Sequence, residues 1–412
     1  MRVLMLGWEF PPYFAGGVGT VCYGLTRGLA RSGVHVTYIM PHGPDDAAAD
    51  HVKLLVADRI MKRLGVNTVR VKSLLTAYTS TTEYEQRYGQ VLLGEPKGKR
   101  TGAIYGKDLH EEMYRFAASV EDVAHDEEFD IIHAHDWTTI PAALALKRAS
   151  GKPLVMHVHI TEFDKTGGEH ADPDVYNLER EGFHTADRVI AISELVKRRL
   201  IESYGVDPAK IRVVYNTVEY GDGPTGPREQ VAQGDRLVLF LGRVTLQKGP
   251  DYFLEAAAKV STIIPNARFV VAGTGDMLPR MVERAAHLGI GNKVIFTGFV
   301  SREDGDRLYR MADVFVMPSV SEPFGIVPLE AMKQGTPVIV SRQSGVSEVL
   351  KNVLKVDFWD VDDLANKIVA ALTYNDLHHE LRHQGTNEIR GATWDIPAAQ
   401  CLDLYKETTG QA

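Results

Sequence analysis

The sequence predicts an α/β protein with two doubly wound parallel sheets. Short apolar runs, which are typical of strands buried on both faces, alternate with segments of helical periodicity in both halves of the chain. A stretch rich in glycine, proline and charge, residues 216–235, separates the halves and has no apolar period. Because 412 residues exceed what one core usually organises, we expect a first domain over residues 1–215, this linker, and a second domain over residues 236–392.

The first half opens with a strand, a glycine-rich turn, a helix and a second strand. The strands are the apolar runs 2–8 and 34–41, and parallel strands of such a unit require a right-handed crossover. The turn contains Gly16 and Gly17, which let a backbone approach a ligand closely. It does not have the G-x-G-x-x-G spacing, and no acidic residue follows the second strand, which argues against NAD.

The second half repeats this alternation. Helical segments separate apolar runs that predict strands at residues 236–242, 267–273, 293–300, 313–319 and 336–342. The order of elements predicts a second parallel sheet with helices on both faces.

Composition excludes several classes of protein. A net charge of −8 argues against nucleic acid as the main binding partner. The content of 44% apolar and 24% charged residues is ordinary for a globular protein. No apolar run reaches the roughly 18 residues of a membrane-spanning helix. Two cysteines, Cys22 and Cys401, form no disulfide framework and suit a reducing compartment, so we expect a cytoplasmic protein.

The first half also contains a less regular stretch, residues 43–125, with a basic cluster. Its cations are Lys53, Arg59, Lys62, Arg63, Arg70 and Lys72. A membrane surface or a polyanion would suit such a patch. We expect instead a solvated helix face and an exposed strand, because a charge cluster alone usually has that origin.

The segment 321–341 carries the strongest candidate site. A strand ends near Pro318, and a helix is expected to begin near Gly325 or Ile326. The first backbone N–H groups of that helix, at Ile326 and Val327, have no partner within the helix. At the carboxyl edge of a parallel sheet, such donors predict a site for an anion.

Charged side chains surround this predicted anion site. Glu330 follows the helix start by about one turn, where its carboxylate would accept hydrogen bonds from a ribose. Glu322 lies on the other side, where the hydroxyls of a sugar would be. Arg243 and Lys248 follow the strand 236–242 and would stabilise a departing diphosphate without a metal.

Two H-x-H pairs occur at the ends of neighbouring strands in the first half. His133 and His135 precede Asp136, and a second pair is His157 and His159. Each pair places both rings on one strand face. A zinc or iron site is one interpretation, but no carboxylate third ligand stands at motif spacing. We expect His133 and His157 to be structural, and His159 and Asp136 to contact sugar hydroxyls.

Taken together, these segments resemble the retaining GT-B glycosyltransferases of the family 4 type, which include the glycogen and starch synthase relatives. The resemblance covers essentially the whole chain and rests on WEFPP, HAHDW, LGRVTLQKG and EPFGIVPLEAM, among others. It implies two Rossmann-like domains that face one another across a cleft. It also implies that the final helix, within residues 393–412, crosses back onto the first domain.

The resemblance implies a nucleotide-diphospho-sugar bound mainly by the second domain and an acceptor read by the first. Arg243 and Lys248 match the diphosphate-binding pair, and Glu330 matches the ribose-binding glutamate. Further matches are Glu322 beside the donor sugar, Gly325, Ile326 and Val327 in the amide-donating turn, Gly16 and Gly17 in the first-domain loop, His159 beside the sugar, and Asp136 on the cleft wall. The glycogen synthase relatives usually carry K-x-G-G where this chain has AGGVG, which sets it apart from them.

The expected activity is hexosyl transfer with retention, by front-face attack and without metal or cofactor. His159, Arg243, Lys248 and Glu322 form the expected catalytic set. Glucose is the first expectation for the sugar and an α-glucan for the acceptor, with UDP, ADP or GDP as the nucleotide. The alternatives are transfer of mannose or another hexose to a lipid or small molecule, a sugar-nucleotide epimerase of the same fold, a non-catalytic sensor, and a pyridoxal-dependent phosphorylase.

Overall fold

The computed structural model describes residues 1–11, 17–43, 49–63, 107–167, 171–221 and 234–411. Gly16, Arg70, Lys72 and most of the expected linker therefore lie outside the described residues. Two compact units make up the chain. The first unit comprises Met1–Glu162, Ala171–Asn216 and Trp394–Ala412, and the second unit comprises Phe163–His170 and Thr217–Thr393.

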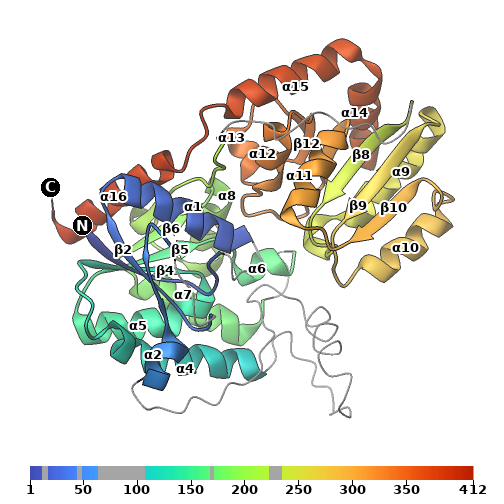
Figure 1. Ribbon diagram of the computed structural model, residues 1–412. Helices are drawn as coiled ribbons and strands as arrows, with labels where there is room; N and C mark the ends of the chain where they lie inside the picture. The colour runs from blue at the N-terminus through green and yellow to red at the C-terminus, as the bar shows by residue number, and fades with distance from the viewer. Residues whose placement is uncertain (12–16, 44–48, 64–106, 168–170, 222–233, 412) are drawn as a thin grey trace. The chain divides into compact units, whose positions relative to one another are not determined.

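A seven-stranded parallel sheet forms the centre of the first unit (Figure 1). The strand order is β3-β2-β1-β4-β5-β6-β7, and the runs that form the central strands are almost wholly buried. Burial on both faces explains why these strands read as continuous apolar runs. The strands are β1 (Arg2–Leu6), β2 (His35–Met40), β3 (Lys53–Val56), β4 (Ile131–His135), β5 (Leu154–Val158), β6 (Arg188–Ala191) and β7 (Ile211–Val213).

A six-stranded parallel sheet forms the centre of the second unit. Its strand order is β10-β9-β8-β11-β12-β13. The strands are β8 (Arg236–Leu241), β9 (Ala267–Ala272), β10 (Val294–Gly298), β11 (Val314–Met317), β12 (Val338–Ser341) and β13 (Leu354–Val356). The prediction of two doubly wound parallel sheets is confirmed.

Both sheets reverse their building direction once. In the first unit the reversal lies between β1 and β4, and in the second unit it lies between β8 and β11. At such a switch point the loops that follow the two strands diverge, and they leave a crevice at the carboxyl ends of the strands. The fold therefore singles out the segments after these four strands as ligand-binding positions.

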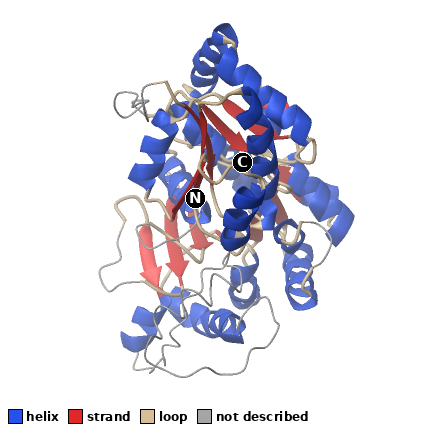
Figure 2. Ribbon diagram, turned by 90° about the vertical axis from the view of Figure 1, so that its right-hand side faces the viewer, coloured by secondary structure: helices blue, strands red, loops and turns tan. Residues whose placement is uncertain are grey.

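Helices flank the strands of each unit (Figure 2). In the first unit they are α1 (Gly17–Arg31), α2 (Ala57–Arg63), α4 (Lys107–Ala124), α5 (Ile140–Ser150), α7 (Pro173–Thr185), α8 (Glu194–Tyr204) and α16 (Asp395–Thr409), and α6 (Glu162–Lys165) begins at the unit boundary. In the second unit they are α9 (Pro250–Ile263), α10 (Leu278–His287), α11 (Arg302–Met311), α12 (Val327–Lys333), α13 (Val346–Val349), α14 (Val361–Thr373) and α15 (Asn375–Ile389). Short polar side chains fix several helix starts: Ser193 caps α8 and Ser301 caps α11.

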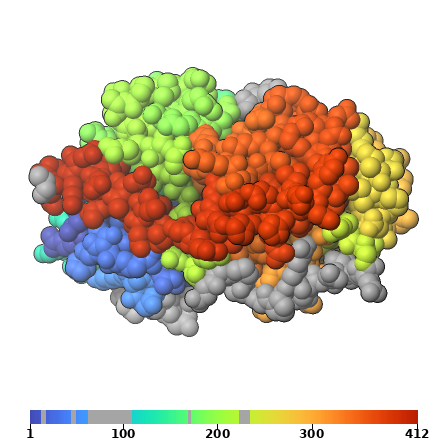
Figure 3. Space-filling view, turned by 90° about the horizontal axis from the view of Figure 1, so that it is seen from above, coloured from blue at the N-terminus to red at the C-terminus, as the bar shows by residue number. Residues whose placement is uncertain are grey.

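The C-terminal helix α16 packs on α1 in the first unit (Figures 1 and 3). Glycines on α1 permit this close approach: a Cβ on Gly24 would lie 2.2 Å from the indole of Trp394, and one on Gly28 would lie 2.5 Å from the Trp394 carbonyl oxygen. Tyr405 on α16 is fully buried in the same core. The predicted return of the final helix to the first domain is confirmed.

Both cysteines are free thiols inside the first unit. Cys22 on α1 and Cys401 on α16 are fully buried. Burial raises the pKa of each thiol to about 12, so neither is a reactive thiolate at neutral pH.

The described part of the basic cluster lies on β3 and α2. Lys53 is exposed and pairs with Glu127, whose Oε1 lies 2.5 Å from the ammonium nitrogen. The solvated-face interpretation of the cluster stays a prediction. In the part of the chain that the structure describes, no helix has the length and apolarity that crossing a bilayer requires.

Candidate functional site

Two loops meet at the switch point of the second unit. One follows β8 and carries Arg243 and Lys248 before α9 begins, and the other follows β11 and carries Glu322. The N–H of Val320 donates to the carbonyl oxygen of Gln247 at 2.9 Å and joins the loops directly. The fold thus places cations and a carboxylate from distant parts of the sequence at the edge where ligands bind in such sheets.

Gly249 makes the close approach of these loops possible. Its φ is +65°, and a Cβ at this position would lie only 2.2 Å from the carbonyl oxygen of Pro318. A side chain there would meet both a disfavoured backbone conformation and an immovable backbone atom. Since Lys248 is the preceding residue, the position of its side chain depends on this contact.

Replacing Gly249 by alanine is expected to lower both the melting temperature and the turnover. The added Cβ pushes against Pro318 and displaces Lys248 from the loop after β11. Gly289→Ala is the matched control, because Gly289 has a φ of +71° with nothing within 4 Å of the added atom. Thermal unfolding and turnover of the two variants should differ clearly. Equal losses would show that the loop contact is unimportant.

Lys248 and Glu322 form an ion pair with each other. The Lys248 ammonium nitrogen lies 2.5 Å from Oε2 of Glu322, and the two side chains are 19% and 8% exposed. The Ser319 hydroxyl donates to the same carboxylate oxygen at 3.4 Å. The sequence predicted separate contacts of these residues with diphosphate and sugar, and the structure shows them in direct contact. Removing either partner leaves a largely buried charge uncompensated.

The backbone of Glu322 is held rigidly at the edge of the sheet. Its N–H donates to the carbonyl oxygen of Gln343 at 3.0 Å, and its own carbonyl accepts from the N–H of Gly345 at 2.9 Å. A parallel bridge to Ser344 results. Such anchoring fixes the direction of a functional side chain before any ligand binds.

The turn before α12 brings the backbone of Gly325 close to the side chain of Glu322. Gly325 has a φ of +91°, and a Cβ on it would lie 2.9 Å from Cγ of Glu322. The helix begins at Val327, close to the predicted start, and Pro328 in its first turn needs no acceptor. α12 has only seven residues. An anion at its start would therefore be held by the N–H groups of Ile326 and Val327 more than by a long helix dipole.

Glu330 is partly buried on α12, next to α11. The hydroxyl of Tyr309 donates to its Oε2 at 3.3 Å. Burial raises the pKa of the Glu330 carboxyl, and the charge of Arg302 opposes that rise. Tyr309 was not predicted as part of the site, because in the sequence it fits an ordinary aromatic side chain on the apolar face of an amphipathic helix.

Among the predicted residues of the first unit, Asp136 stands at the switch point of the sheet, and His159 stands at the end of the neighbouring strand. Asp136 directly follows β4, and His159 directly follows β5. Both side chains are buried, at 1% and 5% exposure. Gly17 is the first residue of α1, is exposed, and has no atom within 4 Å of an added Cβ. The predicted role of Gly16 and Gly17 in a closing loop stays a prediction.

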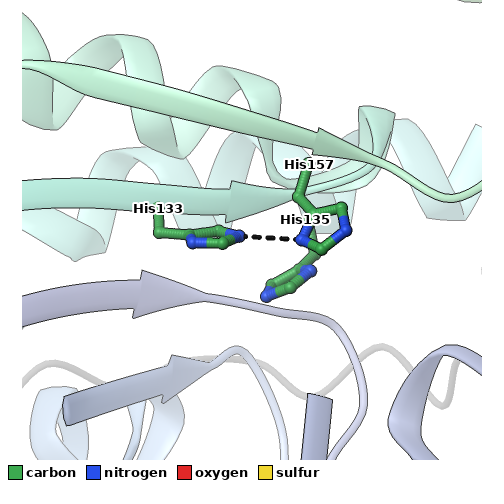
Figure 4. Close-up of side chains that lie close together, drawn as sticks. All are labelled: His133, His135 and His157. Atoms are coloured by element: carbon green, nitrogen blue, oxygen red, sulfur yellow. Dashed lines mark hydrogen bonds between the residues drawn. The ribbon is translucent and has the colours of Figure 1, made fainter. Parts of the chain in front are cut away.

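Three buried histidines of β4 and β5, His133, His135 and His157, lie close together (Figure 4), and His159, which follows β5, stacks on His157. The Nε2 of His133 and the Nδ1 of His157 are 3.1 Å apart, and the Nδ1 of His135 lies 2.8 Å from the Nε2 of His159. The Tyr405 hydroxyl lies 2.5 Å from the Nδ1 of His133 and ties α16 to the stack. Burial lowers the pKa of all of these imidazoles, to about 3 for His133, so the rings are neutral.

Three histidines of the stack have nitrogens close enough together to hold a metal ion, but two of their three ring pairs lie face to face. Possible ligand atoms of His133, His135 and His157 lie within 4.8 Å of one another. Two of the three ring pairs are stacked, with interplanar angles of 27° and 29°, and the pair of His133 and His157 is tilted at 42°. Lone pairs in the planes of stacked rings run side by side and do not converge on a tetrahedral centre. The nitrogens of His133 and His157 that face each other are joined by a hydrogen bond (Figure 4).

Gln247, like Tyr309, was not predicted from the sequence as part of the site in the second unit. Gln247 is 3% exposed, although it lies in a loop between two cations, Arg243 and Lys248. Its carbonyl oxygen joins the two loops, and its side-chain oxygen accepts from Arg243 at 3.4 Å. The sequence could have indicated Gln247 through its position between Arg243 and Lys248. Its burial then requires hydrogen-bond partners for the side-chain amide.

Two family models match the chain. The model described as Glycosyltransferase Family 4 matches residues 15–220, and the model described as Glycosyl transferases group 1 matches residues 226–388. These matches cover the two units separately.

Curated relatives cover nearly the whole chain. An uncharacterized glycosyltransferase of Methanocaldococcus jannaschii is 31% identical, over 98% of this chain and 98% of the relative. A D-inositol 3-phosphate glycosyltransferase of Mycobacterium sp. is 30% identical, over 84% and 82%. A glycogen synthase of Mycobacterium tuberculosis is 25% identical, over 85% and 80%.

Solved structures share the fold. Sucrose-phosphate synthase from Thermosynechococcus elongatus matches with a TM-score of 0.74 at 20% identity and covers 100% of both chains. HepE from Anabaena, solved with UDP and glucose, matches with a TM-score of 0.65 at 16% identity, over 99% and 100%. The predicted GT-B fold, with two Rossmann-like units and a returning C-terminal helix, is confirmed. The chain belongs to the family 4 and group 1 glycosyltransferases.

Proposed function

We propose that this glycosyltransferase moves a hexose, glucose in the first instance, from a nucleotide-diphospho-sugar to a hydroxyl acceptor with retention of the anomeric configuration. One observation carries the proposal. The loops on either side of the switch point in the second unit bring Lys248 into contact with Glu322, and Arg243 in the first of these loops donates to the side chain of Gln247. Two cations beside a carboxylate at this edge suit a diphosphate with a sugar attached to it.

The donor would replace the ion pair between Lys248 and Glu322. Its diphosphate would take Lys248 and Arg243 as counter-charges, together with the N–H groups of Ile326 and Val327. Glu322, released from Lys248, would accept hydrogen bonds from the hydroxyls of the hexose. Because the pair already sits in a largely desolvated place, exchanging one anion for another costs less than bringing a lone cation there.

The chemical step follows from this arrangement. The bond between the anomeric carbon and the diphosphate oxygen breaks, and the acceptor oxygen bonds to the same face of that carbon. The proton of the acceptor hydroxyl goes to the departing phosphate. Negative charge grows on the leaving oxygens in the transition state, where Lys248 and Arg243 stabilise it; each such donor is typically worth about 3–4 kcal/mol.

The relatives suggest which substrates to test first. HepE binds UDP and glucose, which makes UDP-glucose the first donor, before ADP- and GDP-linked sugars. The names of two relatives point to glycogen and to D-inositol 3-phosphate, so an α-glucan and a phosphorylated cyclitol are the first acceptors. Mannose and other hexoses follow. Metal independence and a cytoplasmic location stay predictions.

A thermal-shift panel of nucleotide sugars, followed by product analysis, tests the proposal. A true donor at 100 times its Kd adds about 2.7 kcal/mol of stability. NMR of the product with that donor, an acceptor and EDTA should show the anomeric configuration of the donor. Formation of an epimer from donor alone would favour an epimerase, and inversion in the product would contradict front-face transfer.

Replacing Glu330 by glutamine is expected to raise the KM for the donor about 10- to 100-fold, with a smaller effect on kcat. Hydrogen bonds to a charged group contribute about 1.5–3 kcal/mol, and the neutral amide loses part of this. Because burial raises the pKa of Glu330, donor binding by the wild type should strengthen as the pH rises through that pKa. The glutamine variant should lack this dependence. Glu283→Gln on the exposed face of α10 is the control, and an equal rise of KM there would refute the assignment.

A further inference from the structure

Asp136 has an unusual backbone conformation at the switch point of the first unit. It is the one residue other than glycine with a positive φ among the residues that the structure describes. Its φ of 55° and ψ of 176° fall in a region that is essentially confined to glycine. Such strain persists only where the surrounding contacts over-determine the conformation, and it clusters at functional sites.

The contacts that hold Asp136 join the ends of two strands. Its Oδ1 accepts from the N–H of His159 at 2.6 Å and from the N–H of Ile160 at 3.3 Å. Its own N–H donates to the carbonyl oxygen of His157 at 3.0 Å. On the other side, its carbonyl oxygen accepts from the N–H and the hydroxyl of Thr139, at 3.2 and 3.0 Å.

These bonds fix the chain where β5 ends. A carboxylate that takes two successive N–H groups replaces the sheet hydrogen bonds that end with the strand. The ring of His159 is then held by the Nδ1 of His135 at 2.8 Å. Both the backbone and the ring of His159 are therefore fixed by β4 and the residue that follows it.

We propose that Asp136 is a positioning residue for His159, and that its strained backbone is what turns its carboxylate toward the end of β5. This rests on the proposed function, which places His159 beside the transferred sugar. The Oδ1 that accepts from His159 and Ile160 is committed to the backbone, and the expected contact of Asp136 with sugar hydroxyls stays a prediction.

Three substitutions separate strain from positioning. Asp136→Gly removes the carboxylate and the strain, Asp136→Ala removes the carboxylate and keeps the strain, and Asp136→Asn keeps an oxygen that accepts both N–H groups. The glycine variant should melt at a higher temperature than the alanine variant, which is the reverse of the usual order for these residues. The asparagine variant should retain most of the turnover.

A control residue that bonds the other end of β5 separates positioning from general stability. At the other end of β5, Oδ2 of Asp187 accepts from the N–H of Leu154 at 2.7 Å. Asp187→Ala should lower the melting temperature and leave kcat within about twofold of the wild type. Asp136→Ala and Asp136→Gly should lower kcat at least tenfold, with the KM for the nucleotide sugar nearly unchanged, because the groups proposed to bind the nucleotide lie in the second unit.

Each outcome tests either the strained backbone of Asp136 or the role of Asp136 in positioning His159. A glycine variant that melts below the alanine variant would overturn the strain argument. A kcat for Asp136→Gly like that of Asp187→Ala would overturn positioning, provided His159→Ala itself loses turnover. If His159→Ala keeps full turnover, the role of His159 in the proposed function fails, while the melting order still tests the strained conformation of Asp136 by itself.

Discussion

Lys248→Ala is expected to lower kcat by about two to three orders of magnitude while the protein stays folded. The ammonium group would no longer offset the charge that develops on the leaving diphosphate, and the loss of one such donor typically has this size. The variant should also be less stable, since Glu322 loses its partner. That loss should stay below the about 3–5 kcal/mol of a fully buried broken pair, because the Lys248 side chain keeps 19% exposure.

Lys259→Ala is the matched control for this experiment. Lys259 lies on α9 close to the same loop in sequence, and its ammonium nitrogen pairs with Asp362 at 2.5 Å on the exposed surface. Turnover and thermal unfolding should both stay near the wild-type values, since exposed pairs contribute little. Near-normal turnover in Lys248→Ala would refute the role of Lys248 in stabilising the leaving group.

Acid is expected to destabilise the first unit steeply between about pH 6.5 and pH 4. The histidines of the stack have pKa values lowered by burial, to about 3 for His133, against a usual 6.5. Between these values the unfolded chain binds more protons than the folded chain, so the free energy of unfolding falls as the pH falls. Each histidine contributes up to about 1.4 kcal/mol per pH unit, and four of them together have a large effect.

Denaturant unfolding at a series of pH values measures this slope. His133→Gln removes one titrating ring, so its slope should be shallower by up to about 1.4 kcal/mol per pH unit, whatever its stability at pH 7. His125→Gln is the control, because that side chain is 83% exposed. An unchanged slope in the His133 variant would mean that its imidazole is not held neutral by burial.

Much of the fold could be predicted from local signals. The buried strands of parallel sheets are short apolar runs, and β1 and β8 could be located by that property alone. Gly33 and Gly335 mark helix ends because both adopt a positive φ that other residues avoid. These local signals could not predict the return of α16 to the first unit. Helical periodicity shows that one face of a helix is buried, but not which element covers that face.

The site was predicted as residue types and positions, but not as contacts. The loop after β8 and the loop after β11 are far apart in sequence, so the ion pair between Lys248 and Glu322 emerges only when the switch point forms. The positive φ of Asp136 could not be predicted from the sequence, because tertiary contacts impose this conformation and the residue type alone does not indicate it. The stacked rings of His133 and His135 follow from strand alternation, whereas their neutrality follows from burial.

Calorimetric titration with nucleoside mono- and diphosphates tests the central claim most directly. That claim is that Arg243 and Lys248 hold the second phosphate of the donor at the switch point of the second unit. The account predicts that the wild type binds the diphosphate of the preferred nucleoside at least tenfold more tightly than the monophosphate, and that Arg243→Ala/Lys248→Ala loses this difference. A double variant that keeps the full preference for the diphosphate would contradict the account.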